Sequence, residues 1–317
     1  MRHFLTLRDF SKYEILSLVE HASELKKNPK KLLQDKTLAM IFEKNSTRTR
    51  MAFELAITEL GGKALFLSSN DLQLSRGESI KDTARVIGAM VDFVMMRVNK
   101  HESLVEFAKY SKAPVINALS ELYHPTQVLG DLLTIKECGK MKDDIAKVAF
   151  VGDSNNMCNS WLIAAAILGF DFSVALPKNY EINSEILEFA KEKAKISGAK
   201  IFLTHDKFEA IKGKDVVITD TWVSMGEESE KEKKIKDFDG FIIDEEAMNA
   251  ANQDAILLHC LPAYRGYEVS EESFEKHSKV IFEEAKNRLY VVKALLCFLN
   301  NKILYNFISW RDRIRSF

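Results

Sequence analysis

The sequence is poor in proline, glycine and cysteine, and each shortage excludes a class of protein. Its 317 residues include only 5 prolines and 13 glycines, which disfavours a disordered chain. The 4 cysteines, at positions 138, 158, 260 and 297, do not form the framework of a disulfide-rich protein. They and the 7 histidines are scattered singly, without metal-ligand spacing. We therefore expect reduced thiols, a cytoplasmic protein, and no metal or other cofactor.

Long apolar runs and an excess of one charge are also missing. The most apolar stretch, Trp161–Phe170, is too short to span a bilayer, and the N-terminal residues lack the pattern of an export signal. Acidic and basic residues nearly cancel, leaving a formal net charge of −1, which disfavours nucleic-acid binding. We expect neither a membrane nor a nucleic acid as partner. The 46% of apolar residues suffice for the cores of two ordinary domains.

What the sequence does contain is a regular alternation of short apolar runs with longer amphipathic segments. The short runs predict strands over Leu38–Phe42, Lys63–Leu67, Phe93–Val98, Pro114–Ala118, Lys147–Val151, Phe172–Leu176, Lys200–Leu203, Val216–Thr219 and Ile256–His259. The amphipathic segments predict helices over Arg48–Leu60, Ser79–Met90, Pro125–Glu137, Asn156–Leu168, Ser184–Ser197 and Glu245–Ala251, with a long one from Glu284 toward Ile308. This alternation predicts α/β domains with parallel sheets covered on both faces. Ligands of such sheets bind beyond the carboxyl ends of the strands, so the segments that follow strands are the candidates for chemistry.

The first such segment, Ser46-Thr47-Arg48-Thr49-Arg50, combines hydroxyl and guanidinium groups at the expected start of a helix. A helix N-terminus favours an anion, and arginine adds bidentate contacts with phosphate oxygens. The segment therefore indicates a phosphate site, with an N-cap beside two surface arginines as the alternative. Arg97, at the end of an apolar strand, is either a residue of the rim or a ligand of an anion.

Two further segments follow strands and open helices. His124-Pro125-Thr126-Gln127 has proline at the first helical position, and His124 and Gln127 would lie on one face of the first turn. That pair suits a carbonyl oxygen and an NH2 group, although a plain helix start remains the alternative. Gly152–Asn156 stands where a dinucleotide fingerprint would stand, but its glycine spacing is absent. The absence disfavours a nicotinamide enzyme.

The last two segments follow the strands nearest the C-terminus. Asp220–Gly226 offers an acid, an aromatic ring and a hydroxyl before a glycine, which fits a partner for a substrate amine beneath a mobile flap, or else a helix cap and a loop. The mixed-charge run Glu227–Lys236 behind it is expected to be a solvated face or loop. In His259-Cys260-Leu261-Pro262, Cys260 is either an inert buried thiol or a group that handles protons.

Together and in this order, these motifs resemble the carbamoyltransferase family over almost the whole chain. Glu78–Arg85 and Asn287-Arg288 extend the resemblance. Asp-x-Trp-x-Ser-Met-Gly and His-Cys-Leu-Pro resemble the branch of the family that acts on ornithine, rather than those that act on aspartate or putrescine. A non-catalytic relative that binds a small anion is an alternative from another functional class.

The resemblance implies both an architecture and a reaction. The architecture is two doubly wound α/β domains with parallel sheets and the active site in the cleft between them. Residues 1–138 would bind carbamoyl phosphate, residues 139–287 would bind ornithine, and a C-terminal helix, 288–317, would pack back on the first domain. The reaction is transfer of the carbamoyl group to the side-chain amine of L-ornithine, giving citrulline and phosphate in arginine biosynthesis. Such enzymes are typically homotrimers.

The resemblance also assigns roles to individual residues. The implied ligands of carbamoyl phosphate are Ser46, Thr47, Arg48, Thr49, Gln73, Arg97, His124, Gln127, Cys260, Leu261 and Arg288. The implied ligands of ornithine are Asn156, Asp220, Ser224 and Met225. The implied catalytic residues are Arg97, His124, Asp220 and Cys260.

Overall fold

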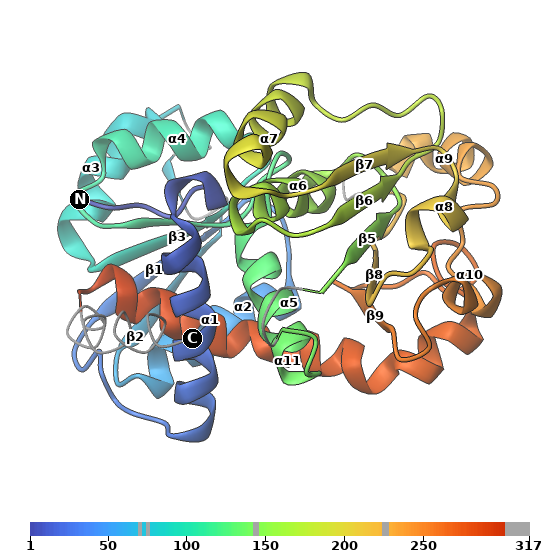
Figure 1. Cartoon of the computed structure of the whole chain (residues 1–317). Helices are drawn as coiled ribbons and strands as arrows, with labels where there is room; N and C mark the ends of the chain where they lie inside the picture. The colour runs from blue at the N-terminus through green and yellow to red at the C-terminus, as the bar shows by residue number, and fades with distance from the viewer. Residues whose placement is uncertain (69–71, 74–76, 142–145, 224–227, 302–317) are drawn as a thin grey trace. The chain divides into compact units, whose positions relative to one another are not determined.

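The computed structural model describes residues 1–68, 72–73, 77–141, 146–223 and 228–301. Contacts divide the chain into two compact units (Figure 1). Unit 1 comprises Met1–Leu5, Tyr13–Ser120 and the chain from Arg288 onward, and unit 2 comprises Thr6–Lys12 and Glu121–Asn287. In the described ranges, no helix combines the length and the apolar character needed to cross a membrane.

Unit 1 is built on a four-stranded parallel sheet in the order β2-β1-β3-β4. Its strands are β1 (Thr37–Phe42), β2 (Lys63–Ser68), β3 (Phe93–Arg97) and β4 (Val115–Leu119). The strand order reverses between β1 and β3, and Phe42 pairs with Arg97 at their carboxyl ends. This edge is therefore the switch point at which such sheets bind ligands.

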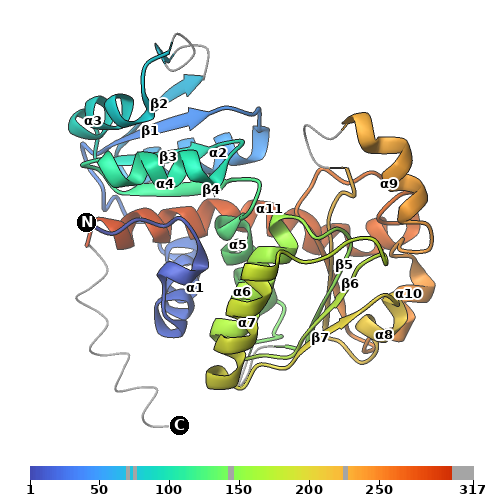
Figure 2. The same ribbon diagram turned by 90° about the horizontal axis from the view of Figure 1, so that it is seen from above.

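Helices cover both faces of this sheet. They are α1 (Lys12–Lys27), α2 (Thr47–Glu59), α3 (Ile80–Met90), α4 (His101–Tyr110) and the later part of α11 (Glu271–Leu299). Helices α3 and α4 lie together on one face (Figure 2), where Leu104 and Phe107 pack with Ile41 and Val94 of the sheet. Because strand side chains alternate between faces, Met40 is directed to the opposite face, and it too is fully buried.

Unit 2 contains a five-stranded parallel sheet in the order β7-β6-β5-β8-β9. Its strands are β5 (Val148–Val151), β6 (Phe172–Ala175), β7 (Ile201–Thr204), β8 (Val216–Thr219) and β9 (Ile256–His259). The order reverses between β5 and β8, where Val151 pairs with Thr219. Thr219 also pairs with His259, so three strands end side by side at the switch point of unit 2.

The helices of unit 2 are α5 (Pro125–Glu137), α6 (Asn156–Leu168), α7 (Ser184–Ser197), α8 (Lys207–Ile211), α9 (Lys231–Asp237), α10 (Glu245–Ala250) and the first part of α11. Short 3-10 turns lie at Leu7–Asp9 (η1) and Glu228–Glu230 (η4). Helices α6 and α7 cover one face of the sheet, and α8 and α10 cover the other (Figure 1). Asn155 starts α6 by accepting bonds from the N–H groups of Met157 and Cys158, and Gly169 ends it with a φ of 87°.

The predicted fold class is confirmed, since both units are α/β with a parallel sheet. All nine predicted strands are present and agree to within one residue at each end. In its described part, the run predicted as a solvated face or loop, Glu227–Lys236, forms helix α9, and most of its residues are exposed. Lys234 is the exception, because it is buried. Helix α11 also begins at Glu271, well before Glu284, because Phe274 and Ile281 recur on one buried face.

The domain boundaries 1–138, 139–287 and 288–317 stay a prediction. The contacts of the structure divide the chain somewhat differently, because they count α5 with unit 2. Thr134 of α5 accepts a hydrogen bond of 3.0 Å from Asn287 of α11, and Asp131 accepts one from Trp161 of α6. These buried polar contacts tie α5 to the helices that follow it.

Candidate active site

The N-terminus of α2 begins just beyond the switch point of the unit 1 sheet. Ser46 caps the helix by accepting a hydrogen bond of 3.2 Å from the N–H of Thr49. The N–H of Glu43, at the end of β1, donates to the carbonyl oxygen of Arg97 at 2.9 Å. The helix dipole and the N–H groups of the first turn make this a favourable place for an anion.

Three guanidinium groups belong to the segments around this helix start. Arg48 lies in the first turn of α2 and is half-buried, whereas Arg97 and Arg288 are buried. Nη2 of Arg288 donates to Oγ1 of Thr49 at 2.7 Å, so α11 brings a cation to the first turn of α2. Arg50 is used differently, because it stacks on Phe66 at 3.9 Å. Concentrated positive charge at a helix N-terminus suits a phosphate.

A second set of polar groups lies at the start of α5. The N–H of His124 donates to Oγ of Ser160 at 2.8 Å, which fixes the entry into the helix. Both His124 and Gln127 are buried. Nε2 of Gln127 donates to Oδ1 of Asp131 at 2.8 Å and to Oε1 of Glu284 at 2.9 Å. Oε1 of Gln127 is buried and accepts no hydrogen bond from the described residues, so it is available to an NH2 group.

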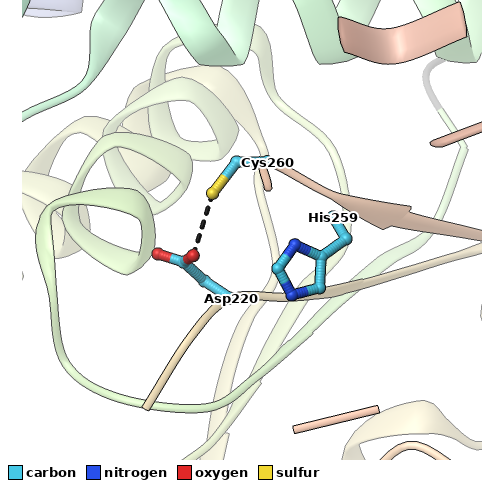
Figure 3. A group of neighbouring side chains, drawn as sticks. All are labelled: Asp220, His259 and Cys260. Carbon is cyan, nitrogen blue, oxygen red and sulfur yellow. Dashed lines mark hydrogen bonds between the residues drawn. The ribbon is translucent and has the colours of Figure 1, made fainter. Parts of the chain in front are cut away.

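A third set surrounds the carboxylate of Asp220, directly after β8. Its Oδ1 accepts hydrogen bonds from the Sγ of Cys260 at 2.8 Å (Figure 3) and from the N–H of Thr221 at 2.7 Å. Its Oδ2 accepts one from Nδ2 of Asn155 at 2.8 Å. The three strands that end side by side thus place an amide, a carboxylate and a thiol together. A buried carboxylate here is suited to hold a cationic group.

The surroundings of Cys260 keep it protonated. Burial raises the pKa of its thiol well above the usual value, and the charge of Asp220 and the hydrogen bond to it raise the pKa further. The thiolate is the nucleophilic form of cysteine, and it is disfavoured beside a carboxylate. The geometry therefore fits a group that orients a neighbour better than one that attacks a substrate.

Asp220, His259 and Cys260 carry potential ligand atoms within 4.8 Å of one another, which makes them a metal candidate in the described part of the chain (Figure 3). Both ring nitrogens of His259 have other partners. Nδ1 accepts the N–H of Leu261 at 2.9 Å, and Nε2 lies 3.1 Å from Oε1 of Glu268. The thiol of Cys260 is engaged with Asp220. The arrangement is thus a hydrogen-bond network that a metal ion would have to break.

Comparison with known proteins shows which family the chain belongs to. A family model for the carbamoyl-P binding domain of aspartate/ornithine carbamoyltransferases matches residues 2–137, and one for the Asp/Orn binding domain matches residues 144–299. The chain belongs to the aspartate/ornithine carbamoyltransferase family. The resemblance seen in the sequence is thereby confirmed.

Individual carbamoyltransferases match over nearly their whole length. An ornithine carbamoyltransferase from Campylobacter jejuni is 85% identical over 302 residues, which cover 95% of this chain and 99% of the relative. The crystal structure of an anabolic ornithine carbamoyltransferase from Campylobacter jejuni is 84% identical, with a TM-score of 0.94 and coverage of 95% of this chain and 100% of the other. An ornithine carbamoyltransferase from Pyrococcus furiosus is 44% identical, with a TM-score of 0.89 and coverage of 93% and 96%.

The structure shows direct contacts between some of the predicted site residues of this carbamoyltransferase and only the positions of others. It connects Ser46, Thr49 and Arg288 at the start of α2, and it connects Asp220 with Cys260 at the ends of their strands. Arg48 lies in the first turn of α2, Arg97 at the end of β3, and His124 and Gln127 at the start of α5. The other predicted ligands are Thr47 in the first turn of α2, Gln73 as an exposed residue after β2, Asn156 at the start of α6 and Leu261 after β9. Ser224 and Met225 lie outside the described residues.

Three residues at these polar sets were not predicted from the sequence. Asn155, the neighbour of the predicted ornithine ligand Asn156, donates to Asp220. Asp131 and Glu284 both accept from Gln127. The spacing of Gln127 and Asp131 by four positions on a predicted helix was a usable signal, since such pairs lie on one face. Nothing in the sequence pattern connects Glu284 to them, because that contact spans 157 positions.

Proposed function

We propose that this chain is an ornithine carbamoyltransferase that forms L-citrulline and phosphate from L-ornithine and carbamoyl phosphate, in arginine biosynthesis. The observation that carries the choice of amino acid is the carboxylate of Asp220, buried and hydrogen-bonded at the end of β8. A carboxylate in that place attracts the cationic ornithine and repels aspartate. The relatives that cover almost the whole chain bear the name ornithine carbamoyltransferase, which supports the same choice.

The phosphate of the donor is proposed to bind at the start of α2. Ser46, Thr47, Arg48 and Thr49 would surround it with N–H, hydroxyl and guanidinium groups, and Arg288 would add a further charge through its place beside Thr49. Gln73 is proposed as one more contact with the donor. Because a helix N-terminus and several arginines favour a dianion, the leaving phosphate would also be stabilised here.

The carbamoyl group needs partners for its oxygen and for its NH2. Arg97, His124 and Thr49 are proposed to donate to the oxygen, which gains negative charge in the transition state. Oε1 of Gln127 and the backbone carbonyl of Leu261 are proposed to accept from the NH2. Preorganised donors of this kind are the largest expected contribution to the rate.

The chemical step needs no covalent enzyme intermediate. The side-chain ammonium of ornithine first loses a proton to solvent. The neutral amine then attacks the carbamoyl carbon, and the bond from that carbon to the phosphate oxygen breaks. The proton lost by the amine on bond formation passes to the departing phosphate, which is basic enough to accept it. Asp220 and Cys260, with Asn156, Ser224 and Met225, are proposed to hold ornithine so that its side-chain amine meets the carbamoyl carbon, a gain in orientation.

We also propose a homotrimer in the cytoplasm. In unit 1, Met51 and Leu55 of α2 and Leu65 and Phe66 of β2 are exposed apolar side chains, and a second copy of the chain would cover them. All four cysteines are free thiols, which suits a reducing compartment. Light scattering should give a mass of about three chains, and Leu55→Glu should lower it if this surface is the interface.

An assay of the ureido product and of released phosphate, with ornithine, aspartate and putrescine in parallel, tests the function. We expect turnover with carbamoyl phosphate and ornithine, and little with either competitor. Putrescine carries no carboxylate, so it shows how much of the selectivity depends on the amino-acid end of ornithine. Turnover of aspartate in preference to ornithine, or of none of the three amines, would contradict the proposal.

A further inference from the structure

The amide of Gln127 has only one orientation that its neighbours allow. Its Nε2 lies 2.8 Å from a carboxylate oxygen of Asp131 and 2.9 Å from one of Glu284. An amide oxygen in that place carries no hydrogen and could donate to neither carboxyl group, whereas an NH2 group can donate a hydrogen bond to each of them. The two carboxyl groups thus direct Oε1 of Gln127 the other way, where no described residue donates to it.

We propose that Asp131 and Glu284 are positioning residues for carbamoyl transfer, which hold the Gln127 amide so that Oε1 accepts a hydrogen bond from the NH2 of carbamoyl phosphate. This inference rests on the proposed function. It assigns a role to two acids that do not touch the substrate. By orienting Gln127, Asp131 and Glu284 favour a substrate whose transferred group carries an NH2.

The packing around the two acids makes the arrangement rigid. Asp131, Gln127 and Glu284 are each at most 1% exposed. The second oxygen of Asp131 accepts a hydrogen bond of 3.1 Å from Nε1 of Trp161. Residues held in this way resist a change of conformation, because a buried polar group that loses its hydrogen-bond partner raises the free energy of the folded state.

Glu284 also connects Gln127 to the end of β9. Its Oε2 accepts a hydrogen bond of 2.9 Å from the N–H of His259, directly before Cys260 and Leu261. One carboxyl group therefore orients the amide of Gln127 and the backbone of the segment proposed to supply a second acceptor for the same NH2. Glu284 would thus position both proposed acceptors, Oε1 of Gln127 and the backbone carbonyl of Leu261, which gives a reason for burying an acid here.

The two carboxyl groups also interact with each other. Burial raises the pKa of Glu284 well above its usual value, and the negative charge of Asp131 and a hydrogen bond with it raise the pKa further. The protonated form of Glu284 is therefore more favoured than that of an ordinary carboxyl group. In that form Glu284 still accepts from Gln127 through a lone pair and can donate its proton to Asp131.

Glu284→Gln tests the inference with almost no change in shape. Glu284 accepts from Gln127 at one oxygen and from the N–H of His259 at the other, whereas the new amide has only one oxygen. If that oxygen stays with His259, the new NH2 faces Gln127, and the Gln127 amide should rotate to present its own NH2 toward carbamoyl phosphate. We expect the Kd of carbamoyl phosphate, measured by calorimetry, to rise by about 10- to 100-fold. The Kd of inorganic phosphate, which has no NH2, should stay within about twofold, because the start of α2 is untouched.

A double-mutant cycle separates positioning from general structure. If Glu284 acts through Gln127, Glu284→Gln should cost little more in the Gln127→Ala background, whereas independent effects would add. Glu272→Gln, an exposed residue of the same helix, is the control and should change neither Kd. Asp131→Asn provides a second variant if Glu284→Gln does not fold.

Two results would overturn the inference. One is an equal loss of affinity for carbamoyl phosphate and inorganic phosphate, and the other is additivity with Gln127→Ala. Unchanged affinity for carbamoyl phosphate in a folded variant would overturn it as well. Failure of the proposed function looks different, because the wild-type protein would then form no citrulline or would not bind carbamoyl phosphate at all.

Discussion

Nζ of Lys234 lies 2.7 Å from Oδ2 of Asp153, and the two side chains are only 5% and 9% exposed. Lys234 belongs to α9, and Asp153 belongs to the loop after β5 that also carries Asn155. The hydroxyl of Tyr180 donates to Asp237 at the end of α9, at 3.1 Å. Helix α9, which follows Asp220 in the chain, is thus held to the rest of unit 2 by two contacts. One of them reaches the loop that carries Asn155, which donates to Asp220.

Breaking the buried ion pair should destabilise the protein. Lys234→Met removes the ammonium that compensates the buried carboxylate of Asp153, and we expect the free energy of unfolding to fall by about 3–5 kcal/mol. Urea denaturation followed by circular dichroism measures this. Lys233→Met, at an exposed position of α9, should change the free energy by less than about 0.5 kcal/mol. Equal losses in the two variants would mean that the pair contributes little.

Loss of either predicted phosphate arginine should damage catalysis strongly. Arg48→Ala and Arg97→Ala each remove a charge-assisted contact worth about 2–4 kcal/mol in the transition state, so kcat/KM for carbamoyl phosphate should fall at least ~30-fold. Arg50→Ala is the matched control, since Arg50 stacks on Phe66 and pairs with Glu54 at the surface. Near-normal kcat/KM in both test variants would refute the phosphate site.

Asp220→Asn should separate the two substrates. The substitution removes the charge that faces the amino acid, so kcat/KM for ornithine should fall by at least about 100-fold, while the Kd of carbamoyl phosphate changes by less than about threefold. Steady-state kinetics and calorimetry measure the two quantities. Asp239→Asn, at an exposed position, controls for a general effect of charge. If both substrates were affected alike, Asp220 would have a structural role.

Cys260 should be slow to react with alkylating reagents. Because its pKa is raised, the thiolate population at pH 7–9 is below that of an ordinary thiol, and it grows only at higher pH. We expect iodoacetamide to modify Cys260 at pH 8 at least about tenfold more slowly than glutathione, measured by mass spectrometry.

The same protonated thiol predicts the behaviour of Cys260→Ser. A serine hydroxyl can also donate to Asp220, so this variant should keep measurable turnover and a normal fold. A nucleophilic role would require the variant to be almost inactive. Trapping a carbamoyl thioester on the wild-type enzyme during turnover would contradict the mechanism.

Much of the fold could be predicted because the strands of both sheets are short and continuous, and all except the edge strands β2 and β7 are largely buried. Ile256–His259 and Val216–Thr219 agree with the structure at both ends, since burial on both faces leaves no polar residue inside these strands. Helix α9 was not predicted because its sequence, Lys231–Asp237, is polar except for Ile235, and the burial of Lys234 is explained only by its partner Asp153. That partner is far away in sequence.

The candidate site also contains residues that the sequence predicts and residues that it does not. Residues that directly follow a strand, such as Asp220 and Cys260, were found because the position itself predicts a ligand site. Residues that act on other side chains, such as Glu284, were not found, because their contacts depend on how α5, α11 and β9 pack. Spacing in the sequence carries no information about such contacts.

The hydrogen bond between Arg288 and Thr49 has a consequence for how the molecule is made. The two residues are 239 positions apart, yet both belong to unit 1. As the chain emerges from the ribosome, β1–β4 appear early, but the guanidinium that completes the start of α2 appears only after all of unit 2 has been synthesised. A nascent or truncated chain that ends before Arg288 would therefore lack part of the proposed phosphate site, and we expect it to bind carbamoyl phosphate more weakly than the full chain does.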